Sequence, residues 1–253
     1  MTVKPKIITR LERVEKKYWL EEETARLFLD LAREHIQADQ YPQYTICNLY
    51  YDTGDYELIR RSIDKPPYKE KMRLRSYGRA GPEDVVFLEL KKKYNGRVFK
   101  RRIALSLAEA VDYLAFGKRP TREGQVLREL DYFIEYYRPE PRVYLAYDRQ
   151  AYTGVAEPGL RITFDRNIRF RTERLTLSQE GGRPLAEDGK VLLELKACDA
   201  YPLWLTHILS DLKLYPTSFS KYGKAYAQLL SWNARRDDQC SPALSTPPQA
   251  ACR

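Results

Sequence analysis

Apolar and charged side chains alternate along several stretches of the chain. In residues 86–93 (VFLELKKK), Val86, Leu88 and Leu90 occupy one set of alternate positions, while Glu89 and Lys91 belong to the other. Successive side chains of a strand point to opposite faces, so this period indicates a strand with one apolar and one charged face. Strand character of this kind predicts eight strands, at about 8–19, 44–53, 69–77, 85–93, 97–105, 142–152, 160–170 and 190–198.

Helical periodicity appears between these strands. Ser106 followed by Glu109 forms a capping-box pattern, which predicts that a helix begins at residue 107. The expected helices cover residues 22–36, 107–116, 122–137, 202–212 and 219–232. Residues 233–253 are polar, proline-rich and without period, and we expect them to form a disordered tail after a single domain of residues 1–232.

The charged faces decide between two folds. An ordinary two-faced sheet would turn them to water, but about eight strands can also close into a barrel whose apolar outside is covered by helices. Carboxylates and cations recur two residues apart, as in Glu15/Lys17, Glu89/Lys91 and Glu194/Lys196. We therefore predict an α+β fold, a closed eight-stranded antiparallel β-tunnel with helices packed on the outside. Buried cations need compensation, so the interior must hold a polyanion, together with a divalent metal.

Composition narrows the chemistry. The formal net charge of +9 favours an anionic partner. Four cysteines without a CxxC pair and two isolated histidines argue against zinc, disulfide and histidine chemistry. The sequence contains no stretch of about 18 apolar residues, which a transmembrane helix needs. We therefore expect a cytoplasmic protein.

Eight short motifs, in order, resemble the VTC domain, the polyphosphate polymerase domain of the triphosphate tunnel metalloenzyme (CYTH-like) superfamily. The motifs are EKKYWL (15–20), LYYDT (49–53), KMRLRSYG (71–78), FLELKKKYNGRVFKRR (87–102), YDRQAY (147–152), LRITFDRNI (160–168), LLELK (192–196) and SFSKYGKAY (218–226). Each motif is short, but the ordered set is specific. The resemblance implies an eight-stranded tunnel and metal-dependent transfer of the ATP γ-phosphate onto inorganic polyphosphate.

The resemblance also implies site residues. The phosphate-binding, catalytic positions are Lys17, Arg73, Arg75, Lys91, Lys100, Arg102, Arg149, Arg161, Lys196 and Lys221. Tyr147 and Ser220 match further substrate contacts, and Glu194 matches the metal-binding glutamate. Glu15, Glu89 and Asp165 are second choices for a Mn²⁺ or Mg²⁺ ion, because these ions prefer carboxylate oxygens.

Two alternatives stay open at this point. The same tunnel could hydrolyse tripolyphosphate or a nucleoside triphosphate, or the chain could be a non-catalytic module that binds polyphosphate or RNA. We favour ATP and polyphosphate over nucleic acid, because the 20 tyrosines do not form a stacking platform. The oligomeric state stays open, and a separate membrane partner is compatible with the pattern.

Overall fold

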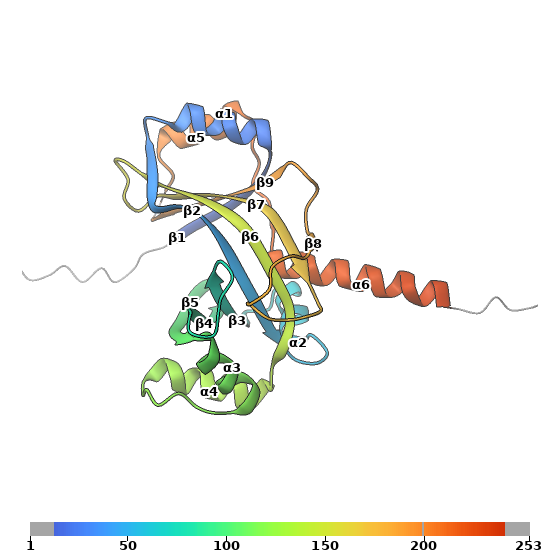
Figure 1. Ribbon diagram of the computed structural model, residues 1–253. Helices are drawn as coiled ribbons and strands as arrows, with labels where there is room; N and C mark the ends of the chain where they lie inside the picture. Colours follow the sequence, from blue (N-terminus) through green and yellow to red (C-terminus); the bar gives the residue numbers. More distant parts are fainter. Residues whose placement is uncertain (1–12, 199, 241–253) are drawn as a thin grey trace, which may run out of the picture.

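The computed structural model describes residues 13–198 and 200–240. Its strands are β1 (Arg13–Glu21), β2 (Ile36–Asp52), β3 (Tyr68–Tyr77), β4 (Val85–Tyr94), β5 (Arg97–Ser106), β6 (Glu140–Gly154), β7 (Arg161–Arg171), β8 (Arg183–Pro184) and β9 (Lys190–Cys198). Its helices are α1 (Glu22–Ala32), α2 (Glu57–Ile63), α3 (Leu107–Phe116), α4 (Gln125–Tyr137), α5 (Leu203–Asp211) and α6 (Lys221–Cys240). Figure 1 shows their arrangement.

One antiparallel sheet contains all the long strands, in the order β1-β9-β7-β6-β2-β3-β4-β5, with β8 paired to β7. This confirms the predicted α+β class and the eight strands. Closure differs from the prediction in one respect: among the described residues, the end strands β1 and β5 are not joined to each other by hydrogen bonds.

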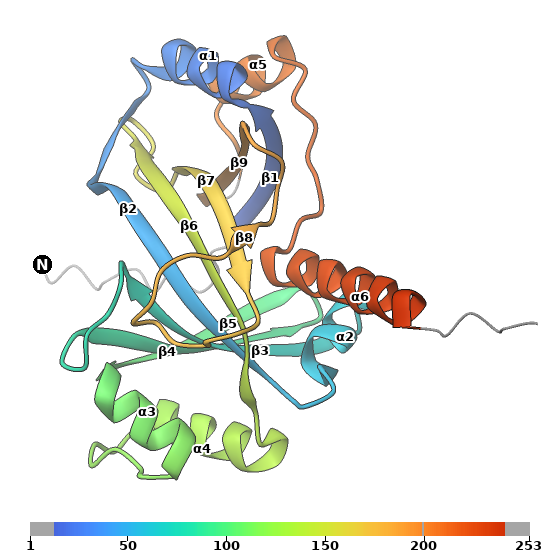
Figure 2. The same cartoon turned by 45° about the vertical axis from the view of Figure 1, so that its right-hand side comes forward.

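The long strands β2 and β6 connect two halves of the sheet. In Figure 2, β1, β9 and β7 lie in the upper half below α1 and α5, and β3, β4 and β5 lie in the lower half above α3 and α4. Each half has an apolar core on its outer face. Phe28 of α1 belongs to the upper core, and Phe133 of α4 belongs to the lower core. The alternating apolar positions of the sequence therefore face these helices, as predicted.

Helix α6 does not follow the expected pattern of helices outside the sheet. Its Tyr222, Ala225 and Tyr226 form a third core with Leu145 of β6 and Leu192 of β9. Leu192, Glu194 and Lys196 are two residues apart along β9, so their side chains point to the same face of the sheet. This core therefore occupies the same face as the charged rows. We call this the inner face; one part of it is apolar and covered by α6, and the other part is ionic.

Some element boundaries differ from the predictions, and one helix was missed. Ile36 begins β2 rather than ending a helix, and the short helix α2 was not predicted. Helix α6 continues to Cys240, beyond the helix end predicted at residue 232. Residues 241–253 of the tail and the start of the first predicted strand lie outside the described residues. None of the helices in the described part combines the length and apolar character needed to cross a membrane.

Candidate functional site

Strand pairing places opposite charges next to each other on the inner face. Glu194 of β9 lies opposite Lys17 of β1, and Asp165 of β7 lies opposite Arg149 of β6. In the other half, Glu89 of β4 lies between Arg73 of β3 and Arg102 of β5. Each carboxylate therefore has a cation as its cross-strand neighbour, an arrangement that stabilises a sheet. These contacts form two ionic clusters, one in each half.

The first cluster, which we call the Glu194 cluster, is built on β1, β9, β7 and β6. Lys196 Nζ lies 3.2 Å from Glu194 Oε1 and 4.0 Å from Glu15 Oε2. Lys17 Nζ lies 3.7 Å from Glu15 and 3.9 Å from Glu194. Arg149 Nη2 donates to Glu194 Oε2 at 3.3 Å. Two predicted metal ligands, Glu15 and Glu194, therefore share the same cations.

Asp165 anchors the far side of this cluster and is fully buried. Arg149 donates to both of its oxygens, at 2.7 and 2.8 Å, and Lys221 at the start of α6 donates at 2.6 Å. The Tyr147 ring lies under both cations, with its centroid 4.4 Å from Lys221 Nζ and 5.2 Å from the Arg149 guanidinium carbon. Asp165 thus holds two of the predicted phosphate-binding cations in place.

Two carboxylates of this cluster, Glu194 and Asp165, are ionised. Burial raises the pKa of Glu194, but the charges of Lys196 and Lys17 outweigh it and hold that pKa well below its usual range. The pKa of Asp165 is lowered for the same reason, with Lys221 and Arg149 overcoming burial. Both groups are therefore acceptors at neutral pH.

The second cluster, which we call the Glu89 cluster, lies on β3, β4 and β5. Glu89 is 2% exposed, and three predicted cations contact its carboxylate: Arg73 at 2.7 Å, Lys100 at 2.7 Å and Arg102 at 3.0 Å. Arg75 Nη1 lies 4.0 Å away. Burial raises the pKa of Glu89, but these cations lower it to about 2. Four cations share one carboxylate, so this half of the face carries an excess of positive charge.

Neutral side chains hold the arginines of the second cluster. Arg73 Nη1 donates to Tyr50 Oη at 3.1 Å, and Arg75 Nε donates to Asn48 Oδ1 at 2.9 Å. Tyr50 and Asn48 lie opposite the same two arginines in the β2–β3 pairing. The guanidinium groups are therefore pre-positioned, which lowers the entropic cost of binding an anion.

A row of like charges lies beside the Glu89 cluster. Lys91 of β4 is paired with Lys71 of β3 on one side and with Lys100 of β5 on the other. Within the described part of the chain, Lys71 and Lys91 make no ion pair. Burial lowers the pKa of Lys71 to about 8, and the nearby Lys69, Lys91 and Lys17 add to this effect. Like charges directly opposite each other destabilise a sheet, so this row needs an anion.

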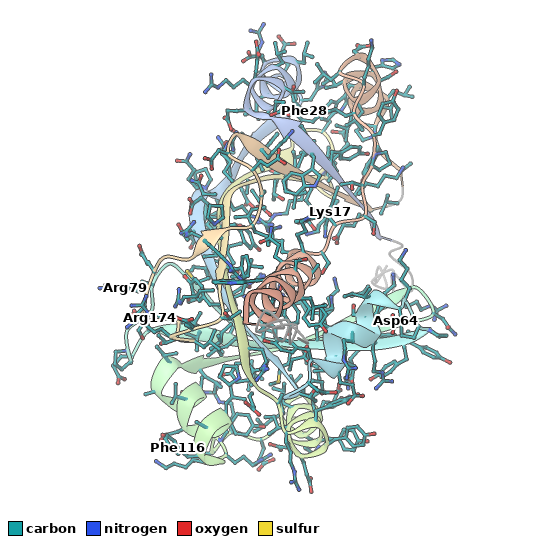
Figure 3. All side chains as sticks on the ribbon, turned by 90° about the vertical axis from the view of Figure 1, so that its right-hand side faces the viewer. Lys17, Phe28, Asp64, Arg79, Phe116 and Arg174 are labelled. Atoms are coloured by element: carbon teal, nitrogen blue, oxygen red, sulfur yellow. The ribbon has the colours of Figure 1, made fainter. Side chains whose placement is uncertain are left out.

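The start of α6 joins the two halves. Ser220 caps the helix by accepting a hydrogen bond from Gly223 N at 3.2 Å, and its hydroxyl also contacts Lys71 Nζ at 3.4 Å. Lys17 of β1 donates to the Phe219 carbonyl at 3.0 Å, and in Figure 3 it lies beside the beginning of α6. Together with the Lys221–Asp165 contact, these bonds bring β1, β3 and β7 to one place.

Arg161 and Lys91 lie at the periphery of the site. Arg161 Nη2 contacts Asp39 at 2.7 Å and Tyr44 Oη at 3.3 Å, and its side chain is 41% exposed. Lys91 is also exposed. Of the predicted cations, these two are the ones that no ionic cluster holds among the described residues.

The carboxylates differ in their fitness for a divalent metal. Among the described residues, no three His, Cys, Asp or Glu side chains lie close enough together to hold an ion by themselves. Mg²⁺ and Mn²⁺ commonly bind one or two carboxylates and take their other ligands from phosphate and water. Glu15 and Glu194, which share the contacts of Lys17 and Lys196, fit that donor set. Glu89 fits it poorly, because three cations within 3.0 Å already engage its oxygens.

Three residues of the site were not among the predicted site residues. Lys71 could have been found, since it alternates with Arg73 and Arg75 along the same strand. Asn48 and Tyr50 lie in the run ICNLYY, which is buried on both faces, so no alternation distinguishes them. Only the pairing of β2 with β3 reveals their role.

The fold and the site define a protein of the triphosphate tunnel type, with cations from the strands gathered on the inner face of an antiparallel sheet. A family model of the VTC domain matches residues 12–230. The chain therefore belongs to the VTC domain family, which confirms the resemblance found in the sequence.

Two solved structures were compared with the chain. A protein from Bacillus halodurans, provisionally named an adenylate cyclase, matches with a TM-score of 0.51 and 15% identity over 82% of this chain and 93% of that chain. A Hippeastrum protein, provisionally named an adenylyl cyclase and described as having a dominant triphosphatase activity, matches with a TM-score of 0.48 and 15% identity, over 83% and 93%. At such identity, the first likeness supports the fold alone. A search of curated proteins found no match.

Proposed function

We propose that the chain is a divalent-metal-dependent polyphosphate polymerase that transfers the γ-phosphate of ATP onto a growing polyphosphate chain. The observation that carries the proposal is the lysine row Lys71–Lys91–Lys100 beside the Glu89 cluster. These like charges face one another across neighbouring strands. Among the described residues Lys71 and Lys91 make no ion pair and Lys100 contacts Glu89, so the row keeps the excess positive charge that a binding surface for a linear polyanion requires. VTC family membership supports the same reaction.

In the proposed reaction, a terminal phosphate oxygen of the polyphosphate attacks the γ-phosphorus of ATP. The bond from that phosphorus to the β-phosphate oxygen breaks, and ADP leaves with the electron pair. The nucleophile is already ionised, so no general base is needed, which agrees with a site that contains no histidine among its described residues. The chain's own groups align the two phosphates and neutralise charge.

Individual residues have distinct tasks in this proposal. Arg73 and Arg75 are held by Tyr50 and Asn48, and their planar forks suit paired phosphate oxygens. Lys91 and Lys100 are the exposed members of the lysine row, and Lys91, which makes no ion pair among the described residues, suits the growing chain. The remaining predicted contacts, all at the ionic face or at the start of α6, are Lys17, Lys100, Arg102, Tyr147, Arg149, Arg161, Lys196, Ser220 and Lys221.

Glu194 and Glu15 would hold the Mn²⁺ or Mg²⁺ ion. When bound, such an ion neutralises charge on the transferred phosphoryl group. Glu194→Gln should therefore abolish Mn²⁺ binding, measured in electron paramagnetic resonance titrations as the decrease in the signal of the free ion, and reduce turnover. The matched variant Glu89→Gln should leave Mn²⁺ binding intact, because Glu89 serves its neighbouring arginines and lysine. Loss of Mn²⁺ binding in Glu89→Gln with retention in Glu194→Gln would reverse this assignment.

Incubation with ATP and Mn²⁺, followed by sizing of products on a gel, tests the reaction itself. A polymerase yields long polyphosphate chains and ADP. Free orthophosphate without chains would show a hydrolase of the same fold, and tight polyphosphate binding without turnover would show a binding module. Either of these two results contradicts the proposal, and the Arg73→Ala variant serves as the control of strongly reduced activity.

A further inference from the structure

A separate cavity of about 520 Å³ lies away from the ionic face. It is bounded by the end of β7, the loop before β8 and α6, and four arginines line it, with Trp232 and two glutamates. The arginines are Arg79, Arg171, Arg174 and Arg183. A cavity of this size matches small-ligand sites, which occupy about 300–1,000 Å³. None of its lining residues belongs to the Glu194 cluster, the Glu89 cluster or the lysine row.

Arg171 builds one wall of the cavity. Its guanidinium donates to the carbonyl groups of Arg174, Thr176, Gln179 and Gly181, at 2.7 to 3.2 Å. The same group lies 3.6 Å from the centroid of the Tyr144 ring. These bonds fix the loop that carries the other lining residues, so the cavity has a defined shape.

Arg183 contributes an unsatisfied donor to the cavity. Its guanidinium is sandwiched between Phe170 and Trp232, with 4.5 and 3.9 Å to the ring centroids. The Nη2 atom is buried and has no hydrogen-bond partner among the residues that the structure describes. A buried donor without a partner is unfavourable, so the site is incomplete without an acceptor from a ligand.

Arg79 and Arg174 supply further free donors. Neither guanidinium makes a hydrogen bond or an ion pair with any residue that the structure describes. Both lie near each other at the edge of the molecule in Figure 3. Glu173 and Glu180 are the carboxylates of the lining, so arginines outnumber them by four to two.

We propose that this cavity is a second anion site, which binds the phosphate group of a small phosphorylated molecule. Arg79, Arg174 and Arg183 would donate to its oxygens, since guanidinium forks match phosphate geometry. Trp232, which is 44% exposed, would lie against the remainder of the ligand. The proposal does not depend on the polymerase reaction.

Trp232 provides a reporter for this site alone. The chain has three tryptophans, and in the double variant Trp19→Phe/Trp204→Phe only Trp232 remains. Its fluorescence should change saturably when inorganic phosphate, ADP, ATP or tripolyphosphate is added, because the stacked Arg183 moves. Comparison of the four probes distinguishes free phosphate from a nucleotide as the source of the phosphate group.

Arg79→Ala/Arg174→Ala in the single-tryptophan protein should weaken binding of the tightest-binding of the four probes at least tenfold, or about 1.4 kcal/mol. Both side chains lack partners among the described residues, so folding should be preserved. Arg33→Ala, an exposed arginine on the distant α1 side, and Arg73→Ala in the ionic face should leave the signal unchanged.

The proposal is overturned if no probe gives a saturable change, if Arg79→Ala/Arg174→Ala binds as tightly as the parent, or if Arg73→Ala removes the signal. If the single-tryptophan protein does not fold, calorimetry with tripolyphosphate on the otherwise unaltered chain replaces it. Two classes of site should then become one in Arg79→Ala/Arg174→Ala, and one class in both proteins would overturn the proposal.

Discussion

Lys71 is largely buried beside three cationic neighbours, and its one side-chain hydrogen bond within the described part of the chain is to Ser220. Its lowered pKa is the cost of holding an ammonium group in a partly desolvated cationic row. A bound phosphate chain favours the charged form. Ligand binding and protonation of Lys71 are therefore coupled.

This coupling predicts a pH dependence. The pKa of Lys71 is about 8 in the free protein and rises when a polyanion binds. Affinity for tripolyphosphate without metal should therefore be constant below this pKa and fall as the pH rises through about 8, by at most roughly tenfold per pH unit. Calorimetry across this range measures it. Lys71→Met should flatten the slope near pH 8, and an unchanged slope in that variant would contradict the assignment.

Arg73 tests the fork geometry at one residue. Arg73→Ala should lower kcat/KM by roughly 10²-fold, since a charge-assisted hydrogen bond contributes about 1.5–3 kcal/mol. The kcat/KM of Arg73→Lys should lie between those of the parent and of Arg73→Ala, because an ammonium group keeps the charge but cannot form paired hydrogen bonds. Steady-state kinetics measures kcat/KM of both variants, with the exposed Arg33→Ala as control. Equal activity of Arg73→Lys and the parent would show that only charge is needed.

At the scale of elements, Asp52 links two helices to the sheet. It is fully buried, accepts from the amide groups of Leu58 and Ile59 in α2, and accepts from Tyr222 Oη of α6 at 2.7 Å. Tyr222 also stacks on Tyr50, with ring centroids 4.5 Å apart. The position of Arg73 therefore depends on α6 through Tyr50.

Removal of this link should destabilise the protein. Asp52→Ala leaves three amide donors, those of Thr53, Leu58 and Ile59, and the Tyr222 hydroxyl without their acceptor, so we expect a loss of about 2–4 kcal/mol in the free energy of unfolding. Urea denaturation followed by circular dichroism measures it, with the exposed Asp30→Ala as control. A loss equal to that of the control would show that Asp52 does not anchor the helices.

The elements that were predictable from sequence share a local cause. Alternation over the strands and the capping box of Ser106 and Glu109 are encoded within a few residues, and both are confirmed. Helix α2 has only seven residues, and it depends on Asp52, which lies in the preceding strand. Ile36 continues a helical stripe in sequence, yet it pairs with Gly154 of β6. These misses arise where tertiary contacts override a local pattern.

At the scale of the whole molecule, the division of the inner face is the feature that sequence could not supply. On the inner face of β9, the apolar Leu192 and the ionic Glu194 both alternate with apolar residues of the outer face. Their period is identical, so only the position of α6 decides which part is covered. The cations were predictable individually, but their partition into two clusters follows from strand order.

Because the lysine row carries excess positive charge, removal of one of its charges should stabilise the free protein and weaken its binding of anions. Lys91→Gln should stabilise the free protein by about 0.2–1 kcal/mol, because it removes the central charge of the lysine row. The same change should weaken tripolyphosphate binding. Thermal unfolding with and without tripolyphosphate measures both effects. A variant that is less stable and binds as tightly would contradict a row built for a ligand.

The most direct test of the central claim is a crystal structure of the chain with tripolyphosphate and Mn²⁺. We predict phosphate groups on the ionic part of the inner face, within hydrogen-bond distance of Arg73, Lys91 and Lys196. Phosphate found only on the outer faces, with the lysine row and both clusters unliganded at saturating concentration, would contradict the account.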